Sequence, residues 1–443
     1  MKKSIFLFIF GLSIWGASAQ TNFSAVPEGF GANTTGGGSV AAETVTTFAD
    51  LKAKLTSSTA KVILVSGEIT VPSGQPISAV VTNKTLIGLP GAKLINETQS
   101  NPGSGILYLK PGSNNVIIRN LIFVGPGAYD IDGNDNLTAD GCTNLWVDHC
   151  EFQDGQDGNF DLKGLTDNVT VSWCKFTYLK PAVCCGSGGS NDHRFSDLVG
   201  SSASNAPADG HYSITFQGCY WADGCKERMP RARNAELHIL NCYYNTSVSG
   251  SRALGLGGGI NNTTCYVENT NFASISNVYA NYNSTDGGTV AVNFTGCLNQ
   301  GSAVNVGTVT APSYTATVIP AEDVADAVTN TGCGAGATLN VNSSGEISVG
   351  ICAATAGTEN IKANNSIYPV VTNDSLKIYF GNRNPETADI ELFSTNGQKV
   401  LSFKKASVSG SVFTADISSL AAGTYICKVK AGEVITNLRI LKK

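Results

Sequence analysis

Charged residues are scarce in this chain: they make up 14% of its 443 residues, and the formal net charge is only −5. Proteins that bind nucleic acid carry a strongly basic surface, so this balance argues against a nucleic-acid partner. Long apolar runs are also missing, since no stretch reaches the roughly 18 apolar residues that a membrane helix needs. We therefore expect no membrane span, and an acidic substrate would need a local group of cations.

Helix-forming periodicity is rare as well, whereas Gly (49 residues), Ser, Thr, Asn and Val abound. Such a composition is typical of proteins built from strands and turns. Cysteine is plentiful, but the 13 cysteines include no CxxC motif and no Cys/His cluster with the spacing of a zinc site. The sequence therefore indicates an all-β protein without structural zinc.

The first residues have the layout of a secretory signal peptide, with Met1-Lys-Lys3, the apolar run Ile5–Trp15 and Ala17-Ser-Ala19. The predicted signal peptide comprises residues 1–19. Export places the cysteines in an oxidising compartment, where disulfides form. Because their number is odd, we expect at least one unpaired sulfur within the chain.

A short repeat organises the middle of the chain. It consists of alternating apolar residues followed by Cys, one further residue and an aromatic residue. A unit this short cannot bury its own apolar face, but stacked copies can, so the repeat predicts a solenoid of short strands over residues 20–340. The copies are Leu145–Phe152, Val169–Phe176, Ile214–Trp221 and Leu237–Tyr244, with weaker ones at Val116–Phe123 and Val292–Cys297.

Five cysteines occupy the same position of this repeat. Adjacent coils stack about 4.8 Å apart, so neighbouring sulfurs would lie near disulfide distance. We favour a column of small, apolar, unpaired thiols inside the solenoid. The five are Cys150, Cys174, Cys219, Cys242 and Cys297.

The two ends of the solenoid and the carboxyl-terminal part have their own signals. Phe48–Leu55 predicts a helix that covers the open edge at one end, and Ala321–Thr329 predicts a short closing helix at the other. Residues 341–366 are poor in large apolar side chains and are expected to form a linker. Alternating apolar residues from 367 to 443 predict a small β-sandwich.

Aspartates gather on both sides of the strand Leu145–Phe152. Stacked coils could bring them together as a cage of oxygens, which suits Ca²⁺ because this ion takes six to eight oxygens in irregular geometry. Solvated aspartates at turns are the alternative. The residues are Asp130, Asp132 and Asp135 on one side, and Asp154, Asp157 and Asp161 on the other.

Cations gather in Lys226-Glu-Arg-Met-Pro-Arg-Ala-Arg233, in an otherwise charge-poor chain. Guanidinium groups bind carboxylates through paired hydrogen bonds, so an acidic polymer is an attractive partner, and a solvated loop is the alternative. Lys180 ends a strand and is expected on the same side of the coil as this cationic segment. His149 follows Asp148 without a Ser or Cys nucleophile motif, so we expect a structural histidine.

Taken in order, these motifs resemble those of pectate lyase family 1. The resemblance covers about residues 25–340 and implies a right-handed parallel β-helix that cleaves polygalacturonate by Ca²⁺-dependent β-elimination. Lys180 lies six residues before Gly186, where the family usually has five. The motifs are Trp146-Val-Asp-His149, Asp157-Gly-Asn-Phe-Asp161, Asn168–Trp173, Lys180 with Gly186, and Arg228-Met-Pro-Arg-Ala-Arg233.

The resemblance implies a role for each motif residue. Arg228 matches the base that removes the C5 proton, and Lys180 and Arg233 match contacts to the substrate carboxylate. A guanidinium stays protonated at ordinary pH, so an arginine can act as a base only where neighbouring cations lower its pKa. We therefore predict an alkaline pH optimum for activity. Arg231 and Lys226 are expected to bind substrate, and the expected calcium ligands are Asp132, Asp135, Asp157 and Asp161.

The carboxyl-terminal part is similar to sorting domains of the type IX secretion pathway, through Asn384-Pro385, Leu392–Gly397, Gly423-Thr-Tyr425 and Leu441-Lys-Lys443. This similarity implies an interaction with the secretion machinery and a protein that is secreted or attached to the cell surface. We expect a monomer.

Three other functions remain open. A pectin lyase would act on methylated polymer without a metal, but the aspartates around Asp157 and Asp161 argue against it. A polygalacturonase-type hydrolase would need paired carboxylates and no arginine motif. A non-catalytic β-helix that binds polysaccharide is the third alternative, since fold alone does not confer activity.

Overall fold

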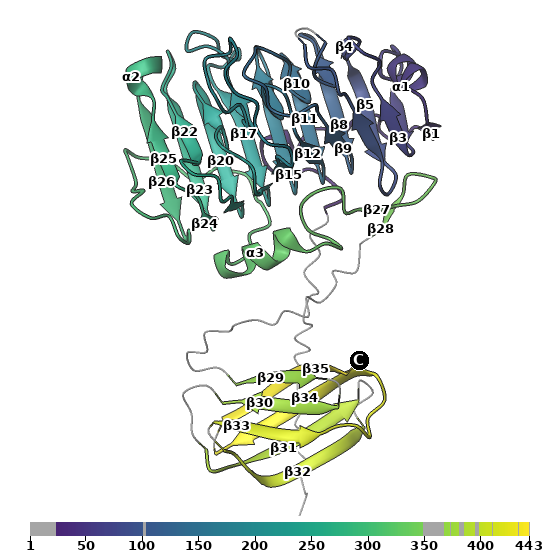
Figure 1. Cartoon of the computed structure of the whole chain (residues 1–443), viewed down its shortest axis with the longest axis vertical. Helices are drawn as coiled ribbons and strands as arrows, with labels where there is room; N and C mark the ends of the chain where they lie inside the picture. The colour runs from purple at the N-terminus through teal and green to yellow at the C-terminus, as the bar shows by residue number, and fades with distance from the viewer. Residues whose placement is uncertain are drawn as a thin grey trace, which may run out of the picture. The chain divides into compact units, whose positions relative to one another are not determined.

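The computed structural model describes residues 24–100, 103–348, 367–372, 374–380, 385–394, 398–409, 411–432 and 434–442 (Figure 1). The predicted signal peptide and residues 349–366 of the expected linker lie outside this range. The chain divides into two compact units, residues 1–355 and 356–443. Among the described residues, no helix is both long and apolar enough to cross a membrane.

The first unit is a parallel β-helix made of three parallel sheets, so the predicted solenoid is confirmed (Figure 1). The first sheet has ten strands: β1 (Ala42–Val45), β2 (Lys61–Val65), β5 (Thr82–Gly88), β8 (Asn114–Arg119), β11 (Thr143–Asp148), β14 (Asp167–Ser172), β17 (Tyr212–Gln217), β20 (Ala235–Leu240), β23 (Thr263–Glu268) and β26 (Val290–Thr295).

The second and third sheets have eight strands each. The second contains β3 (Glu68–Thr70), β6 (Lys93–Ile95), β9 (Ile122–Val124), β12 (Glu151–Gln153), β15 (Lys175–Thr177), β18 (Tyr220–Trp221), β21 (Tyr243–Asn245) and β24 (Asn271–Ser274). The third contains β4 (Ile77–Ala79), β7 (Leu107–Leu109), β10 (Leu137–Asp140), β13 (Phe160–Lys163), β16 (Leu198–Val199), β19 (Arg231–Ala232), β22 (Arg252–Leu256) and β25 (Asn277–Asn281).

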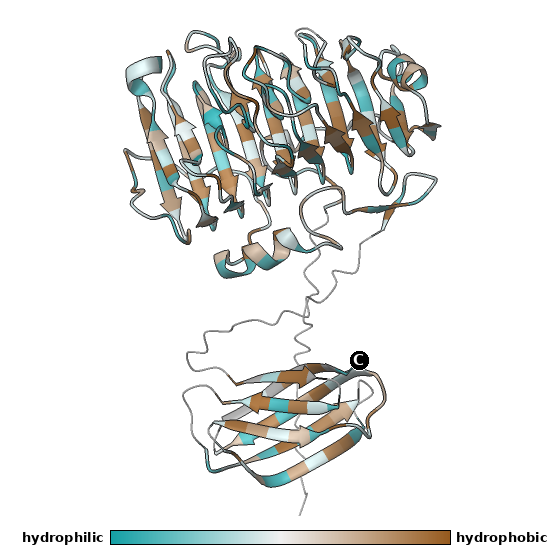
Figure 2. Cartoon of the chain, viewed as in Figure 1, coloured by the Kyte–Doolittle hydropathy of each residue, from teal (hydrophilic) through white to brown (hydrophobic). Residues whose placement is uncertain are grey.

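Each copy of the repeat except the last, Val292–Cys297, forms one strand of the first sheet and the next strand of the second. In register, Val147 lies beside Val171 and Phe152 beside Phe176. The aromatic position therefore builds a stacked column in the core, in which the Phe152 ring lies 4.9 Å from that of Phe123 and 5.3 Å from that of Phe176. Brown and teal residues alternate along these strands in Figure 2, as a period of two requires.

The cysteine column lies where the first sheet turns into the second. Four of its members are fully buried and unpaired, and Cys297 is partly buried and also unpaired, which confirms the expected stack of apolar thiols. The residue before each cysteine turns the chain in the left-handed conformation, which favours Gly or Asn. His149 (φ 47°) holds one of these turns, is buried, and stacks on Trp173, so the structural interpretation of His149 fits its environment.

The two helices that the sequence predicts both pack on the β-helix. The helix α1 (Phe48–Leu55) is confirmed; the side chain of Thr47 accepts a hydrogen bond from the Asp50 backbone N–H, and Leu51 and Leu55 enter the core. The helix α3 (Ala321–Thr329) is also confirmed, but it does not close the end of the solenoid. Its buried face packs beside aromatic side chains on the outside of the second sheet, because Val324 and Val328 form a cluster with Trp173, Tyr220 and Tyr243.

Further short elements were not expected: the 3-10 turn Gly29–Gly31, the helix α2 (Asn283–Asp286) and a hairpin of β27 (Asn340–Val341) and β28 (Ile347–Ser348). The hairpin falls within the first part of the expected linker. Leu339 and Val341 pack against Leu64 and Ile87 on the first sheet, which accounts for the folding of this segment.

The second unit is a sandwich of two antiparallel sheets, as predicted. Alternate residues of each sheet enter a common core, among them Ile378, Ile390 and Val429. One sheet contains β29 (Tyr368–Thr372), β30 (Ser375–Tyr379) and β33 (Val412–Asp416); the other contains β31 (Thr387–Ser394), β32 (Lys399–Ser407), β34 (Gly423–Ala431) and β35 (Val434–Lys442).

Candidate active site

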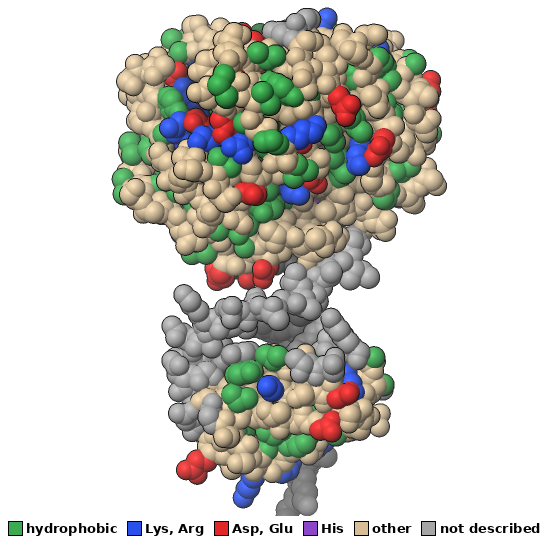
Figure 3. Space-filling model, viewed as in Figure 1, with side chains coloured by type: hydrophobic (Ala, Val, Ile, Leu, Met, Phe, Trp, Pro, Cys, Tyr) green, Lys and Arg blue, Asp and Glu red, His purple; other side chains and the backbone are tan. Residues whose placement is uncertain are grey.

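The outer face of the third sheet brings together the residues that the motifs single out. Along each strand alternate side chains enter the core, as Leu162 on β13 does, so the neighbours of these residues face outward. One outward row is formed by register partners in successive coils, Tyr108, Thr138 and Asp161, and continues through Leu198, Arg231 and Gly255. Figure 3 shows a band of acidic and basic side chains across the β-helix.

Three aspartates form an acidic cluster at β10 and β13: Asp135, Asp157 and Asp161. Burial raises the pKa of Asp135 well above its usual value, and the charges of Asp161 and Asp157 raise it further. Burial also raises the pKa of Asp161, against the lowering effect of Arg228 and Lys163. Neighbouring carboxylates thus oppose the ionisation of Asp135 and Asp161, and a cation among them would relieve this repulsion.

The donor set fits calcium. The Oδ1 atom of Asp135 is buried and has no hydrogen-bond partner among the described residues. Both this atom and Oδ1 of Asp161 lie within 4 Å of the point that a Cβ on Gly158 would occupy, so glycine leaves a cradle between two carboxylates. Within the described residues no three His, Cys, Asp or Glu side chains are already arranged around a metal position, so further oxygens from water or backbone would have to complete the shell.

Asp132 is not part of this cluster. Its side chain is exposed, and it does not figure among the charges that act on Asp135 or Asp161. Asp157, in contrast, keeps about a quarter of its side chain exposed (27%) and contacts the buried His193, whose Nδ1 lies 3.1 Å from Asp157 Oδ1. His193 carried no recognised signal in the sequence, because it lies in a Gly/Ser-rich loop.

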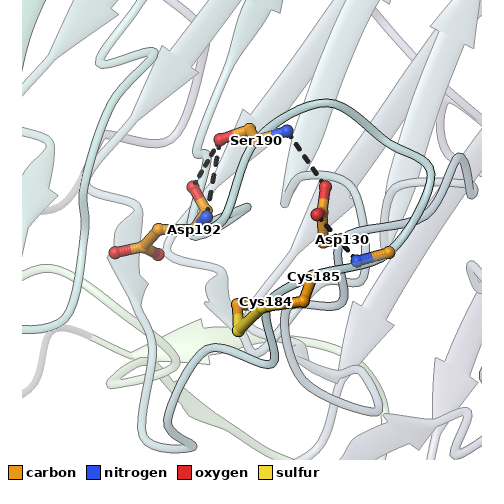
Figure 4. The surroundings of a disulfide bond; sticks show 6 residues. Asp130, Cys184, Cys185, Ser190 and Asp192 are labelled. Carbon is orange, nitrogen blue, oxygen red and sulfur yellow. Dashed lines mark hydrogen bonds between the residues drawn. A yellow bond between two sulfur atoms is a disulfide. The ribbon is translucent and has the colours of Figure 1, made fainter.

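Asp130 anchors that loop (Figure 4). The carboxylate of Asp130 accepts hydrogen bonds from the backbone N–H groups of Gly186 (2.9 Å) and Ser190 (3.0 Å). The adjacent Cys184 and Cys185 form a disulfide in the same loop, which was not predicted. Asp130, one of the aspartates in the first group, thus holds a loop and is not directed into the acidic cluster.

Arg228 lies on the loop before β19, in a left-handed conformation (φ 59°). Its guanidinium carbon lies 4.1 Å from the centroid of the Phe195 ring, and its side chain makes no ion pair or hydrogen bond within the described part of the chain. The Arg228 carbonyl accepts a hydrogen bond from the Asp197 backbone N–H, which fixes the loop. The structure therefore presents an unpaired cation beside the acidic cluster.

Arg228 lines a cavity of about 330 Å³, which we call the arginine cavity. Arg231 also lines it, but its guanidinium pairs with Asp286 and stacks 4.0 Å from the Tyr282 ring. Burial, above all, lowers the pKa of Arg231, and the charge of Arg233 lowers it further. The other charged side chains in the wall are Arg233, Arg252 and Glu227, and the last two form an ion pair at 2.8 Å.

The two predicted lysines do not line this cavity. Lys180 donates from Nζ to the Gly125 carbonyl at 2.9 Å, and Lys226 donates to the Ser249 carbonyl. The sequence analysis did not predict Lys163 as a residue of the site, although its charge lowers the pKa of both Asp135 and Asp161. Its signal was its position two residues after Asp161, which places both on one face of β13.

Comparison with known proteins finds a matching family for each of the two units. Residues 9–338 match the family model of pectate lyase, and residues 366–443 match the secretion system C-terminal sorting domain. The sorting domain marks the chain as exported by the type IX pathway, either secreted or attached to the cell surface.

Curated relatives agree. A pectate trisaccharide-lyase of Thermotoga sp. (strain RQ2) is 33% identical over 221 residues, which are 47% of this chain and 53% of that protein. Pectate lyase A of Aspergillus niger is 29% identical over 306 residues, 67% of this chain and 81% of that protein. This chain thus spans about half the length of the Thermotoga protein.

Solved structures show the same fold. A pectate lyase of Bacillus subtilis is 21% identical, with a TM-score of 0.52 over 74% of this chain and 100% of that one. A pectate lyase of Bacillus sp. N165, solved in complex with trigalacturonate, is 22% identical, with a TM-score of 0.51 over 70% and 98% of the two chains. Because the matching family model covers well over half of the sequence, this chain belongs to the pectate lyase family.

Proposed function

We propose that this chain is a calcium-dependent pectate lyase that cleaves α-1,4-linked polygalacturonate by β-elimination. One observation carries the proposal: an unpaired guanidinium and a cluster of carboxylates share one face of the third sheet, where the charge of Arg228 acts on Asp135 and Asp161. The family and the names of the relatives support the same substrate. Each sugar of this polymer carries a carboxylate, which a metal and guanidinium groups can bind.

In this proposal the acidic cluster holds the metal. Asp135, Asp157 and Asp161 supply carboxylate oxygens, and Asp135 has one that nothing else occupies. When bound, calcium would draw electrons from the uronate carboxylate and so acidify the neighbouring C5–H. Lys163 lies close to the acidic cluster, where its charge lowers the pKa of Asp135 and Asp161. We propose that Lys163 binds the substrate carboxylate.

In this proposal Arg228, in its neutral form, takes the C5 proton. The electron pair of the C5–H bond forms the C4–C5 double bond, and the C4–O bond breaks and leaves the departing sugar with the oxygen, which is then protonated by water. The Phe195 ring lies against the guanidinium group, and Arg228 lines the cavity. Arg233 and Arg252, in the same wall, stabilise the negative charge that develops on the carboxylate as the proton leaves. Lys180 would reach the sugar only by giving up its hydrogen bond to Gly125.

One assay tests the proposal against its alternatives. The protein is incubated with polygalacturonate, with and without EDTA, and an unsaturated product is followed by its ultraviolet absorbance. Absorbance that requires calcium supports a pectate lyase, whereas absorbance on esterified pectin that survives EDTA indicates a pectin lyase. New reducing ends without absorbance indicate hydrolysis, and binding without any product indicates a polysaccharide-binding protein.

A further inference from the structure

A second cavity adjoins the acidic cluster on the amino-terminal side of the third sheet. Its volume is about 350 Å³, which falls in the range of roughly 300–1,000 Å³ that is usual for small-molecule sites. Its walls come from β4, β7 and the segments that precede β7 and β10. We call it the amino-terminal cavity, and its lining includes Pro76, Ser78, Ile106, Tyr108, Asn134 and Asp135.

This cavity continues the outward row that contains the acidic cluster. Ser78, Tyr108 and Thr138 are register partners in successive coils, and Thr138 is the partner of Asp161. Tyr108 lies two coils from Asp161, or about 10 Å at 4.8 Å per coil. A polymer that crosses the strands therefore passes from the arginine cavity over the acidic cluster into the amino-terminal cavity.

The two cavities differ in charge. Four guanidinium groups line the arginine cavity, whereas the lining of the amino-terminal cavity, as far as the structure describes it, contains no Lys or Arg. Its one charged residue is Asp135, and the carboxylate of Asp135 is turned away: Oδ2 accepts a hydrogen bond from Thr138 at 3.0 Å, and Oδ1 adjoins Gly158. The backbone carbonyl of Asp135 faces Gly105, in the cavity wall.

Lys163 lies beside this cavity, and the proposed function assigns it to the uronate over the acidic cluster. Lys163 Nζ lies 5.5 Å from the centroid of the Tyr108 ring, and its charge acts on Asp135 and Asp161 in the acidic cluster. The Tyr108 hydroxyl donates a hydrogen bond to Asp140. This bond holds the ring in the wall of the cavity, where its face can pack on the C–H groups of a sugar. With Lys163 engaged by the first uronate, a second charged uronate here would lose water without a Lys or Arg in the described lining to bind it.

We propose that the amino-terminal cavity binds a methyl-esterified galacturonate unit. This inference rests on the proposed function of the neighbouring site, and it narrows the substrate to partly esterified pectate. The charged sugars lie over the acidic cluster and the arginine cavity. The uncharged ester lies against Pro76 and Tyr108, where its methyl group leaves water.

Binding is the direct test. Calorimetric titration in EDTA compares a galacturonate oligomer with the same oligomer after full methyl esterification, on the wild-type protein and on Ser78→Arg. Ser78 is exposed at the rim, so an arginine there adds a cation without opening the core. We expect Ser78→Arg to shift the ratio of the two affinities toward the charged oligomer by roughly two- to fivefold, the range that an exposed ion pair supplies.

Ser344→Arg is the matched control, since Ser344 is exposed in the β27–β28 turn and should leave the ratio unchanged. Tyr108→Ala should weaken binding of the esterified oligomer more than that of the charged one. The inference is overturned if Ser78→Arg leaves the ratio of affinities at the wild-type value. Lyase activity of the same preparations is measured separately, so a protein that binds without cleaving refutes the proposed function and still decides the role of the cavity.

Discussion

Asp197 is the buried carboxyl group whose replacement tests the electrostatics of this fold most directly. It lies before β16 with its side chain in the core, fully buried, where Oδ2 accepts a hydrogen bond from Trp221 Nε1 at 2.8 Å and Oδ1 has no partner. Burial raises the pKa of Asp197 well above its usual value, against the lowering effect of the Trp221 hydrogen bond. We expect Asp197→Asn to stabilise the protein at neutral pH.

The sign follows from proton binding. At acid pH, below the pKa of the unfolded chain, Asp197 is protonated in both states and contributes no difference. As the pH rises, the unfolded state releases its proton first, so the folded state loses about 1.4 kcal/mol per pH unit until the raised pKa is reached. With an unfolded pKa of about 3.9, the ceiling at pH 7 is about 4 kcal/mol, and Asn escapes this loss.

Thermal unfolding from pH 4 to pH 9 measures the effect. Each kcal/mol shifts Tm by roughly 2–4 °C in a domain of 150–250 residues, and by less in a larger unit. The advantage of Asp197→Asn should be small near pH 4 and grow with pH. A difference in Tm that stays constant with pH, or a variant that is less stable at pH 8, would refute the reasoning.

Asp192 provides the opposite case. Burial opposes its charge, but the hydrogen bonds and charge of Arg194 outweigh this effect and lower the pKa of Asp192. Its ionised form therefore stabilises the fold above the unfolded pKa, and this contribution is lost on acidification. Asp192→Asn should cost at most about 1 kcal/mol at neutral pH, because the pair is partly exposed.

Three further predictions concern the site and the core. Arg228→Lys should lower kcat by about 10²–10⁴-fold, the usual contribution of a general base, while thermal unfolding stays unchanged; near wild-type turnover would remove Arg228 from this role. Calcium at about 100 times its Kd should stabilise the wild-type protein by about 2.7 kcal/mol and should not stabilise Asp161→Asn, as unfolding with and without EDTA would show. Phe152→Ala should cost about 3–5 kcal/mol, measured by denaturant unfolding, because Phe152 stacks on both neighbouring rings; a loss below 1 kcal/mol would contradict the column as a source of stability.

The sequence predicted the solenoid because its signal is local and repeated. Apolar residues with a period of two, then Cys and an aromatic residue, place Phe152 and Phe176 in one column whatever the insertions between them do. Nothing in the sequence of α3 indicates which surface the helix packs against. Its apolar stripe suits any apolar surface, and only the partly buried aromatic residues on the outside of the β-helix, far away in the sequence, decide where it packs.

The candidate site also contains residues that local motifs predict and contacts that only the folded chain creates. The motifs identified Asp157, Asp161 and Arg228, because each stands in a short pattern. The pairing of Arg231 with Asp286 spans 55 residues, and no pattern in either segment announces it. Tyr108 joins the row of Asp161 only through the register of three coils.

By itself, then, the sequence determined the coil, its inward column and the chemical types of the residues on its loops, since each depends on neighbours a few positions apart. The tertiary structure decided which loops meet, which arginines are already paired, and that a cavity whose described lining contains no Lys or Arg adjoins the acidic cluster. The physical reason is that stacked coils of unequal length bring distant residues to one coil spacing, about 4.8 Å, and this register exists only once every coil has folded.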